Sequence, residues 1–158
     1  MVPRAATYDH ETREALLKAA SRIVADEGVA QLTMRRLAAE VGATTSAIYA
    51  LFGSKQEVVR ALHRQGFEHL IERLSRADPG LASLAYAYRA AALEQPDLYR
   101  VMFMLAPSEQ DSEMLRDALG GAAFWALFHG LTSLELNGSL TDPQRVWDYA
   151  LETLCPPS

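Results

Sequence analysis

Hydroxyl-bearing and basic side chains gather between positions 33 and 55, and their types suit nucleic acid better than catalysis. Thr44, Thr45 and Ser46 stand together at the expected start of a short helix, where small hydroxyl groups can hydrogen-bond base edges or phosphates. Thr33 and Lys55 lie at the expected starts of two other helices, where free backbone amides favour a bound anion. This pattern predicts a surface for the phosphates and base edges of DNA.

Two short helices joined by a tight turn are expected to position these side chains. Residues 35–41 form the first helix, and Gly42 ends it because glycine readily adopts the left-handed conformation. Residues 45–52 form the second helix, which Gly53 ends, and Ser54–Glu57 has the pattern of a capping box for the next helix. The segment therefore predicts a helix-turn-helix, whose second helix can enter the major groove.

The rest of the chain shows helical periodicity without β-patterns or repeats. Residues 1–8 are expected to form a flexible arm, and residues 106–111 a polar loop. The other expected helices have these approximate bounds: 9–27, 54–75, 81–94, 96–105, 112–119, 122–136 and 143–154. The sequence predicts an all-α fold, with an N-terminal three-helix domain joined by a long helix to a second α-helical domain.

The distribution of charge agrees with DNA binding in the first part of the chain. The net charge of the 158 residues is −5, but residues 1–60 carry eight Lys/Arg and seven Asp/Glu, a net of +1. Residues 61–158 carry seven and thirteen, a net of −6. Because contacts to phosphates dominate affinity for DNA, the acidity is expected to lie away from the DNA-binding surface.

Other kinds of chemistry have little support. The four histidines, at positions 10, 63, 69 and 129, are scattered, and no Ser-His-Asp, zinc or phosphate-loop spacing is present. We therefore expect no catalytic residue, no metal site and no cofactor. Cys155 is the single cysteine, and the sequence has neither a signal-peptide pattern nor an apolar run long enough for a membrane span. These features predict a soluble cytoplasmic protein.

One set of co-linear motifs resembles the TetR family of transcriptional regulators, most strongly over about residues 15–62. The shared segments are Asp26-Glu27-Gly28, Leu32-Thr33-Met34-Arg35-Arg36-Leu37-Ala38, Val41-Gly42, Ile48-Tyr49, Leu51-Phe52 and Ser54-Lys55. The resemblance implies a DNA-binding domain over residues 1–56 and a ligand-binding and dimerisation domain over residues 57–158.

The resemblance also implies roles for individual residues on DNA. Base contacts would fall on Thr44, Thr45, Ala47 and Ala50, and phosphate contacts on Thr33, Tyr49, Lys55 and Arg35 or Arg36. The second helix of the motif has no Arg, Asn or Gln, which make the strongest bidentate contacts to bases. Part of the specificity is therefore expected to come from DNA shape and from Arg35 or Arg36. One of these two arginines is expected to be only a solvated surface residue.

The second half resembles a TetR-type C-terminal domain that is marked by a Trp-His-Gly pattern, here Trp125, His129 and Gly130. The segment around Gly120-Gly121 is shorter than is usual in that type. Aromatic and soft side chains in this half could line a pocket for a small apolar or aromatic effector, with a packed core as the alternative. The candidate residues are Tyr86, Tyr99, Met102, Phe103, Phe124, Trp125, Phe128 and His129.

Residues 122–136 are apolar on most sides, so this helix should be covered by a second surface as well as by its own domain. With the last helix and its Trp147, it is expected to form a homodimer through a four-helix bundle, while Glu135 is expected to face solvent or to form a salt bridge across the dimer. A two-fold dimer demands a near-palindromic operator in double-stranded DNA.

The function predicted from the sequence is a repressor that is released from its operator by a small-molecule effector. The long helix 54–75 would carry the change from the effector site to the DNA-binding domain. The alternative is a helical ligand-binding or scaffold protein in which the helix-turn-helix only packs. An enzyme is the least favoured class, and regulation by activation stays open.

Overall fold

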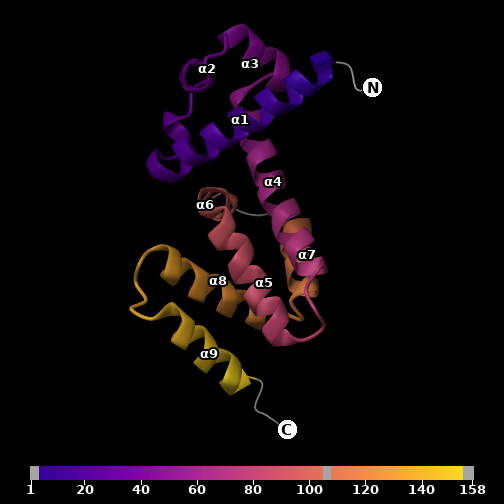
Figure 1. Ribbon diagram of the computed structural model, residues 1–158, viewed down its shortest axis with the longest axis vertical. Coiled ribbons are helices and arrows are strands. Elements are labelled where there is room, and N and C mark those ends of the chain that lie inside the picture. The colour runs from indigo at the N-terminus through magenta and orange to yellow at the C-terminus, as the bar shows by residue number, and fades with distance from the viewer. Residues whose placement is uncertain (1–3, 105–107, 155–158) are drawn as a thin grey trace. The chain divides into compact units, whose positions relative to one another are not determined.

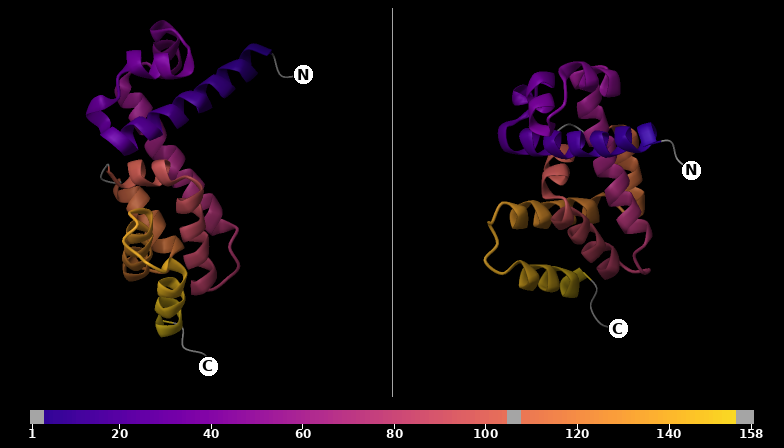
Figure 2. Two further views of the ribbon diagram at one scale, coloured as in Figure 1. Left: turned by 60° about the vertical axis from the view of Figure 1, so that its left-hand side comes forward. Right: turned by 45° about the horizontal axis from the view of Figure 1, so that its top comes forward.

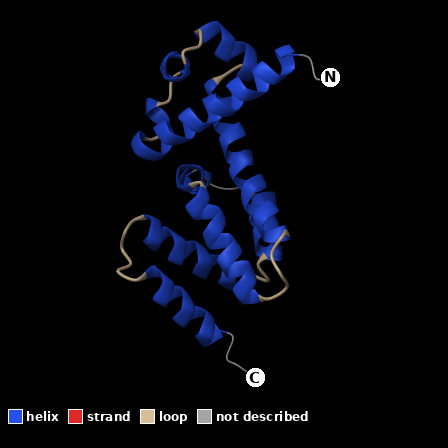
Figure 3. Ribbon diagram, in the orientation of Figure 1, coloured by secondary structure: helices blue, strands red, loops and turns tan. Residues whose placement is uncertain are grey.

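The computed structural model describes residues 4–104 and 108–154, with side chains from residue 10 onward. Throughout these residues the regular structure is helical, which confirms the predicted all-α fold (Figures 1 and 3). The elements are α1 (Arg4–Glu27), η1 (Val29–Gln31), α2 (Met34–Val41), α3 (Thr45–Phe52), α4 (Lys55–Ser75), α5 (Leu81–Glu94), α6 (Pro96–Met104), α7 (Glu109–Ala118), α8 (Ala122–Leu136) and α9 (Pro143–Leu154). None of the described helices combines the length and apolarity of a membrane span.

Packing divides the chain into two compact units. The first comprises the chain up to Gly66 together with Asp97–Ala106, and the second comprises Phe67–Pro96 and the chain from Pro107 onward. Helix α4 therefore contributes its first half to one unit and its second half to the other. The assignment of DNA binding to residues 1–56 and of ligand binding to residues 57–158 remains a prediction about function.

The first unit is built on α1, which packs against α2 and η1, while α2 packs against α3 (Figures 1 and 2). Its apolar core draws side chains from α1, α2, α3 and the first half of α4. Leu98 and Val101 of α6 belong to the same core, with 4% and 0% of their surface exposed. A helix that follows α5 in the sequence thus completes the core of the helix-turn-helix unit.

Two helices begin earlier than the sequence predicted. Helix α1 starts at Arg4 rather than Asp9, because Ala5 and Ala6 are strong helix formers and no glycine or proline separates them from the rest of the helix. Helix α7 starts at Glu109, which we had placed in a loop, because the Ser108 side chain caps the helix through the backbone N–H of Asp111 at 3.1 Å.

In the second unit α8 packs against α5 and α7, and its buried face centres on Phe128. The Phe128 ring lies 6.1 Å from the ring of Tyr88, 6.3 Å from that of Phe124 and 6.0 Å from that of Trp147, measured between centroids. Trp147 is fully buried within the chain, so our placement of it on a dimer surface is wrong. Its position follows from the aromatic packing, which draws the inward face of α9 toward α8.

Gly66, in the middle of α4, lies directly against α6 within the first unit. A Cβ built at Gly66 would stand 3.1 Å from both Cβ and Sδ of Met102, which is closer than ordinary van der Waals contact. Glycine within a helix costs about 1 kcal/mol relative to alanine. The close approach of α6 explains why a glycine nevertheless stands at this position of α4.

We therefore expect Gly66→Ala to have effects of different size in two backgrounds. In the wild-type chain the overpacking against Met102 should exceed the gain in helix propensity and reduce the free energy of unfolding by about 1 kcal/mol. In a Met102→Ala background the same change should destabilise less, because the contacts to Sδ and Cγ are gone while the Cβ of residue 102 remains 3.1 Å away. Urea denaturation of the four proteins measures both effects, and equal effects in the two backgrounds would contradict the contact.

Candidate nucleic-acid interface

The helix-turn-helix is fixed by the caps and turn that the sequence predicted. The Thr33 side chain accepts a hydrogen bond from the backbone N–H of Arg36 at 3.1 Å, and Thr44 accepts one from Ala47 at 3.2 Å. Gly42 between the two helices adopts the left-handed conformation with φ of 68°. A threonine hydroxyl that accepts a capping bond still has its own proton to donate, so a cap does not prevent Thr33 or Thr44 from meeting DNA.

Helix α3 has one buried and one exposed face. Ile48 and Phe52 point into the core of the unit, with 0% and 7% of their surface exposed. The opposite face carries most of the residues that we predicted to meet DNA, and Thr45 is half-buried between the two faces. The exposed residues are Thr44, Ser46, Ala47, Tyr49 and Ala50. None of these side chains carries a charge, so their chemistry suits base edges better than phosphates.

The two arginines of α2 differ in their surroundings. Arg36 donates two hydrogen bonds to the carboxylate of Glu27 in α1, one of them 2.9 Å long, so its guanidinium is committed to fixing α2 on α1. The same contact lowers the pKa of Glu27 and raises that of Arg36, so the pair is intact at neutral pH. Its contribution to stability would be lost only as the pH falls through the lowered pKa of Glu27. Arg35 is exposed and forms no ion pair with any described residue.

Lys55 lies at the start of α4, as predicted. Its Nζ donates a hydrogen bond of 3.5 Å to the carbonyl oxygen of Ala30 in η1. Because Ala30 precedes Thr33 by three residues, this contact brings a positive charge toward the start of α2. The Lys55 side chain therefore ties the start of α4 to η1, the element that precedes α2.

Further contacts that the sequence did not reveal hold α1 to the motif. Arg22 of α1 pairs with Glu40 of α2 at 2.5 Å, and the guanidinium of Arg13 lies 5.2 Å from the centre of the Phe52 ring. The partners in these contacts, and in Glu27–Arg36, lie on different helices, nine or more residues apart. No helical spacing marks them, because they arise only when α1 packs against α2 and α3.

The residues predicted to bind an effector divide between the two units. Tyr99, Met102 and Phe103 lie on α6 in the first unit, where the Tyr99 and Phe103 rings meet edge to face at 4.9 Å. The other five, Tyr86, Phe124, Trp125, Phe128 and His129, belong to the second unit. Burial lowers the pKa of His129, which keeps its ring neutral at physiological pH.

The comparisons with known proteins agree with this geometry. Residues 16–62 match the family model described as "Bacterial regulatory proteins, tetR family". The chain is 24% identical, over 83% of its length, to the uncharacterized HTH-type transcriptional regulator Rv0681 of Mycobacterium tuberculosis, of which the match covers 73%.

Solved structures share the fold. The structure described as "Crystal structure of putative regulatory protein SCO4313" has a TM-score of 0.79 at 22% identity, with 99% of this chain and 100% of that chain covered. The TetR family regulator PfmR from Thermus thermophilus has a TM-score of 0.57 at 19% identity, with 87% of this chain and 80% of that chain covered. The match over residues 16–62 shows that this part of the chain is a helix-turn-helix domain of the tetR type and supports a DNA-binding transcriptional regulator, while the solved structures show the shared all-helical fold.

Proposed function

We propose that the protein is a repressor that binds a near-palindromic operator as a homodimer and is released by a small apolar or aromatic effector. The observation that carries the proposal is the exposed, uncharged face of α3, which stands opposite the buried Ile48 and Phe52. Short hydroxyl and methyl groups on such a face suit the edges of bases in a major groove. Basic groups at Arg35 and Lys55 lie on the neighbouring helices, where they would meet phosphates.

The homodimer is supported by the incomplete covering of α8 and α9. Leu134 of α8 is 46% exposed, and Tyr149 and Leu154 of α9 are 71% and 43% exposed. The outer side of α8 also carries Ala123 and Ala126, which are exposed and small enough for a second helix to approach closely. A second copy of this surface would bury these side chains and place two copies of α3 on one operator.

The effector is proposed from the chemistry of the aromatic residues in the second unit. Phe124, Trp125 and His129 are only partly buried around the fully buried Phe128. A neutral imidazole among aromatic rings can exchange one hydrogen bond with a ligand that is otherwise apolar. Thermal-shift screening of small aromatic compounds against the full chain tests this part of the proposal.

A gel-shift assay on the DNA next to the protein's own gene tests DNA binding. We expect a discrete complex that weakens as salt rises and that unlabelled operator, but not random DNA, competes away. Tyr49→Phe and Lys55→Ala should each weaken the complex while leaving the circular dichroism spectrum and thermal midpoint unchanged. Absence of a specific complex from the wild-type chain would favour the scaffold alternative, in which the helix-turn-helix only packs, whereas undiminished binding by both variants would exclude contacts from Tyr49 and Lys55. A reporter gene behind the same DNA separates repression from activation.

Alanine substitutions at Arg35 and Arg36 are expected to affect different properties, operator affinity for the first and thermal stability for the second, because only Arg36 is held by Glu27. Arg35→Ala should lower operator affinity and reduce the slope of log affinity against log salt by about 1, with no change in thermal midpoint. Arg36→Ala should lower the thermal midpoint and leave the salt slope nearly unchanged. Titration at four salt concentrations together with thermal denaturation measures both quantities, and a reversal of the two patterns would exclude our assignment.

A further inference from the structure

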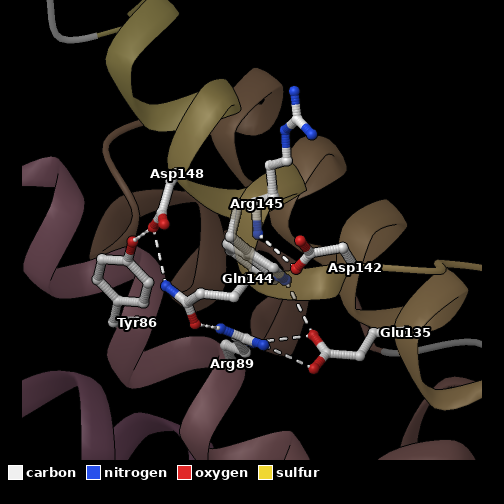
Figure 4. A network of polar contacts seen from close by, with 8 residues as sticks. Tyr86, Arg89, Glu135, Asp142, Gln144, Arg145 and Asp148 are labelled. Atoms are coloured by element: carbon white, nitrogen blue, oxygen red, sulfur yellow. Dashed lines mark hydrogen bonds and ion pairs between the residues drawn. The ribbon is translucent and has the colours of Figure 1, made fainter.

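A polar network joins α9 to α5 and α8 in the second unit, and Figure 4 shows its members pointing toward one another. At its centre Glu135 of α8 receives two hydrogen bonds from Arg89 of α5, both 2.8 Å long. The same carboxylate accepts a hydrogen bond of 3.0 Å from the indole N–H of Trp147 on α9. The Arg89 and Glu135 side chains are only 14% and 11% exposed, so our expectation that Glu135 faces solvent or a partner subunit is wrong.

The network continues along α9 toward solvent. Arg89 also donates to the side-chain oxygen of Gln144 at 2.6 Å, and the Gln144 amide donates to Asp148 at 2.8 Å (Figure 4). Asp148 accepts a further hydrogen bond from the hydroxyl of Tyr86 on α5, and this contact raises the pKa of Tyr86. We call this set of six residues the polar latch: Tyr86, Arg89, Glu135, Gln144, Trp147 and Asp148.

Besides the hydrogen bonds of the polar latch, α9 is attached to the described part of its unit through two buried side chains and the packing of Trp147 on Phe128. Trp147 and Leu151 are its two buried side chains. The closest backbone packing among the described helices of this unit joins α8 to α5 and to α7, and α9 meets them mainly through long side chains. A helix held in this way can open locally while the remaining helices stay folded.

The hydrogen bonds and charges of the polar latch are satisfied only when α9 packs in one position against α5 and α8. A buried ion pair adds little net stability compared with an apolar pair, but the loss of one partner leaves the other charge buried and uncompensated. The Glu135 carboxylate satisfies Arg89 and Trp147 at once, so a change at Glu135 removes hydrogen bonds from α8 to both neighbouring helices, while the packing of Phe128 on both remains.

We propose that α9 is a separately opening helix whose docking is controlled by the polar latch, and that release of the latch disassembles the pair of subunits. The second half of this statement rests on the proposed homodimer, since Tyr149 and Leu154 of α9 would supply part of its interface. Regulation of subunit pairing would then act through α9, with no change needed in α5 or α8.

Hydrogen exchange of the full chain, followed by mass spectrometry, tests the polar latch without reference to DNA or to pairing. Glu135→Gln keeps the shape of the side chain and removes its charge. Amides of residues 143–154 should therefore exchange at least about tenfold faster, which corresponds to a free energy of local opening that is lower by ~1.4 kcal/mol. Amides of α1, α2 and α3 should not change. Glu152→Gln, the same substitution at an exposed position of α9, should leave every segment as in the wild type.

A uniform acceleration in all helices, or no acceleration in α9, would overturn the polar latch. If Glu135→Gln unfolds the whole chain, Asp148→Asn provides the second measurement, because it weakens the outer contacts to Gln144 and Tyr86 while the buried pair remains. It should accelerate exchange in α9 about threefold, and exchange at the wild-type rate would overturn the proposal.

Sedimentation velocity of the same proteins tests the link to pairing. Glu135→Gln should raise the dissociation constant of the dimer at least about tenfold, whereas Glu152→Gln should leave it unchanged. Faster exchange in α9 with an unaltered dissociation constant would overturn the regulatory half of the proposal. A wild-type chain that sediments as a monomer at every concentration would instead refute the proposed homodimer. The hydrogen-exchange data would still test whether the polar latch controls the docking of α9.

Discussion

An Ala47→Glu substitution is expected to reduce operator affinity by more than about 100-fold while leaving the fold intact. Ala47 lies on the exposed face of α3, between the caps at its start and the buried Ile48. A carboxylate at this position would face the phosphates and electronegative base edges of a groove. The juxtaposition of like charges in an interface costs several kcal/mol, and each 1.4 kcal/mol corresponds to a factor of ten.

Fluorescence anisotropy with labelled operator measures the loss, and urea denaturation checks the fold. Glutamate is a good helix former, and the Ala47 side chain contacts solvent, so the free energy of unfolding should change by less than about 0.5 kcal/mol. Ala82→Glu on the exposed start of α5 is the matched control, with the same change in net charge and no expected effect on affinity. Equal losses in the two variants would mean that total charge, rather than the face of α3, controls binding.

The helix-turn-helix could be predicted from the sequence because its signals are local. The threonine caps at positions 33 and 44 and the glycine turn at position 42 act within a few residues of one another, and all three appear in the structure as expected. The exposed and buried faces of α3 follow from helical periodicity in the same way. A candidate surface that is set by one short segment can therefore be predicted with little knowledge of the remaining chain.

The contacts that position this surface could not be predicted, because they join segments that are distant in the sequence. Nothing in the spacing of Glu27 and Arg36 marks them as partners, and the same holds for Glu135 and Arg89. Trp147 was expected on a dimer surface because its periodicity identifies an apolar face but does not identify what covers that face. Periodicity in the sequence shows which face of a helix is buried, but only the tertiary packing determines which element covers that face.

Leu98 of α6 illustrates the same difficulty and leads to the largest expected effect on stability. The run from Leu98 to Leu105 is apolar nearly all round, which predicts that this turn of helix is buried. In the structure Leu98 is 4% exposed and joins the core around α1, whereas Met104 is 54% exposed. The helix therefore has one side committed to the helix-turn-helix unit, and a residue from the second half of the sequence is part of the DNA-binding unit.

Leu98→Ala is expected to destabilise the helix-turn-helix unit by about 2–5 kcal/mol, the usual cost of removing a buried leucine side chain and leaving a cavity. A typical domain has only about 5–15 kcal/mol of stability, so the variant should lose operator binding at a temperature well below the wild type. Urea denaturation gives the free energy, and hydrogen exchange should show faster opening in α1, which shares the core with Leu98.

Met104→Ala is the matched control, since it removes a side chain of similar size from the exposed side of the same helix. It should change the free energy of unfolding by less than about 0.5 kcal/mol. If Leu98→Ala instead leaves α1 as protected as in the wild type, α6 does not support the helix-turn-helix in solution. If α1 is selectively weakened, residues 1–66 expressed without α6 should be less stable than the same residues in the full chain. The DNA-binding unit would then have to be defined by its packing rather than by a single cut in the sequence.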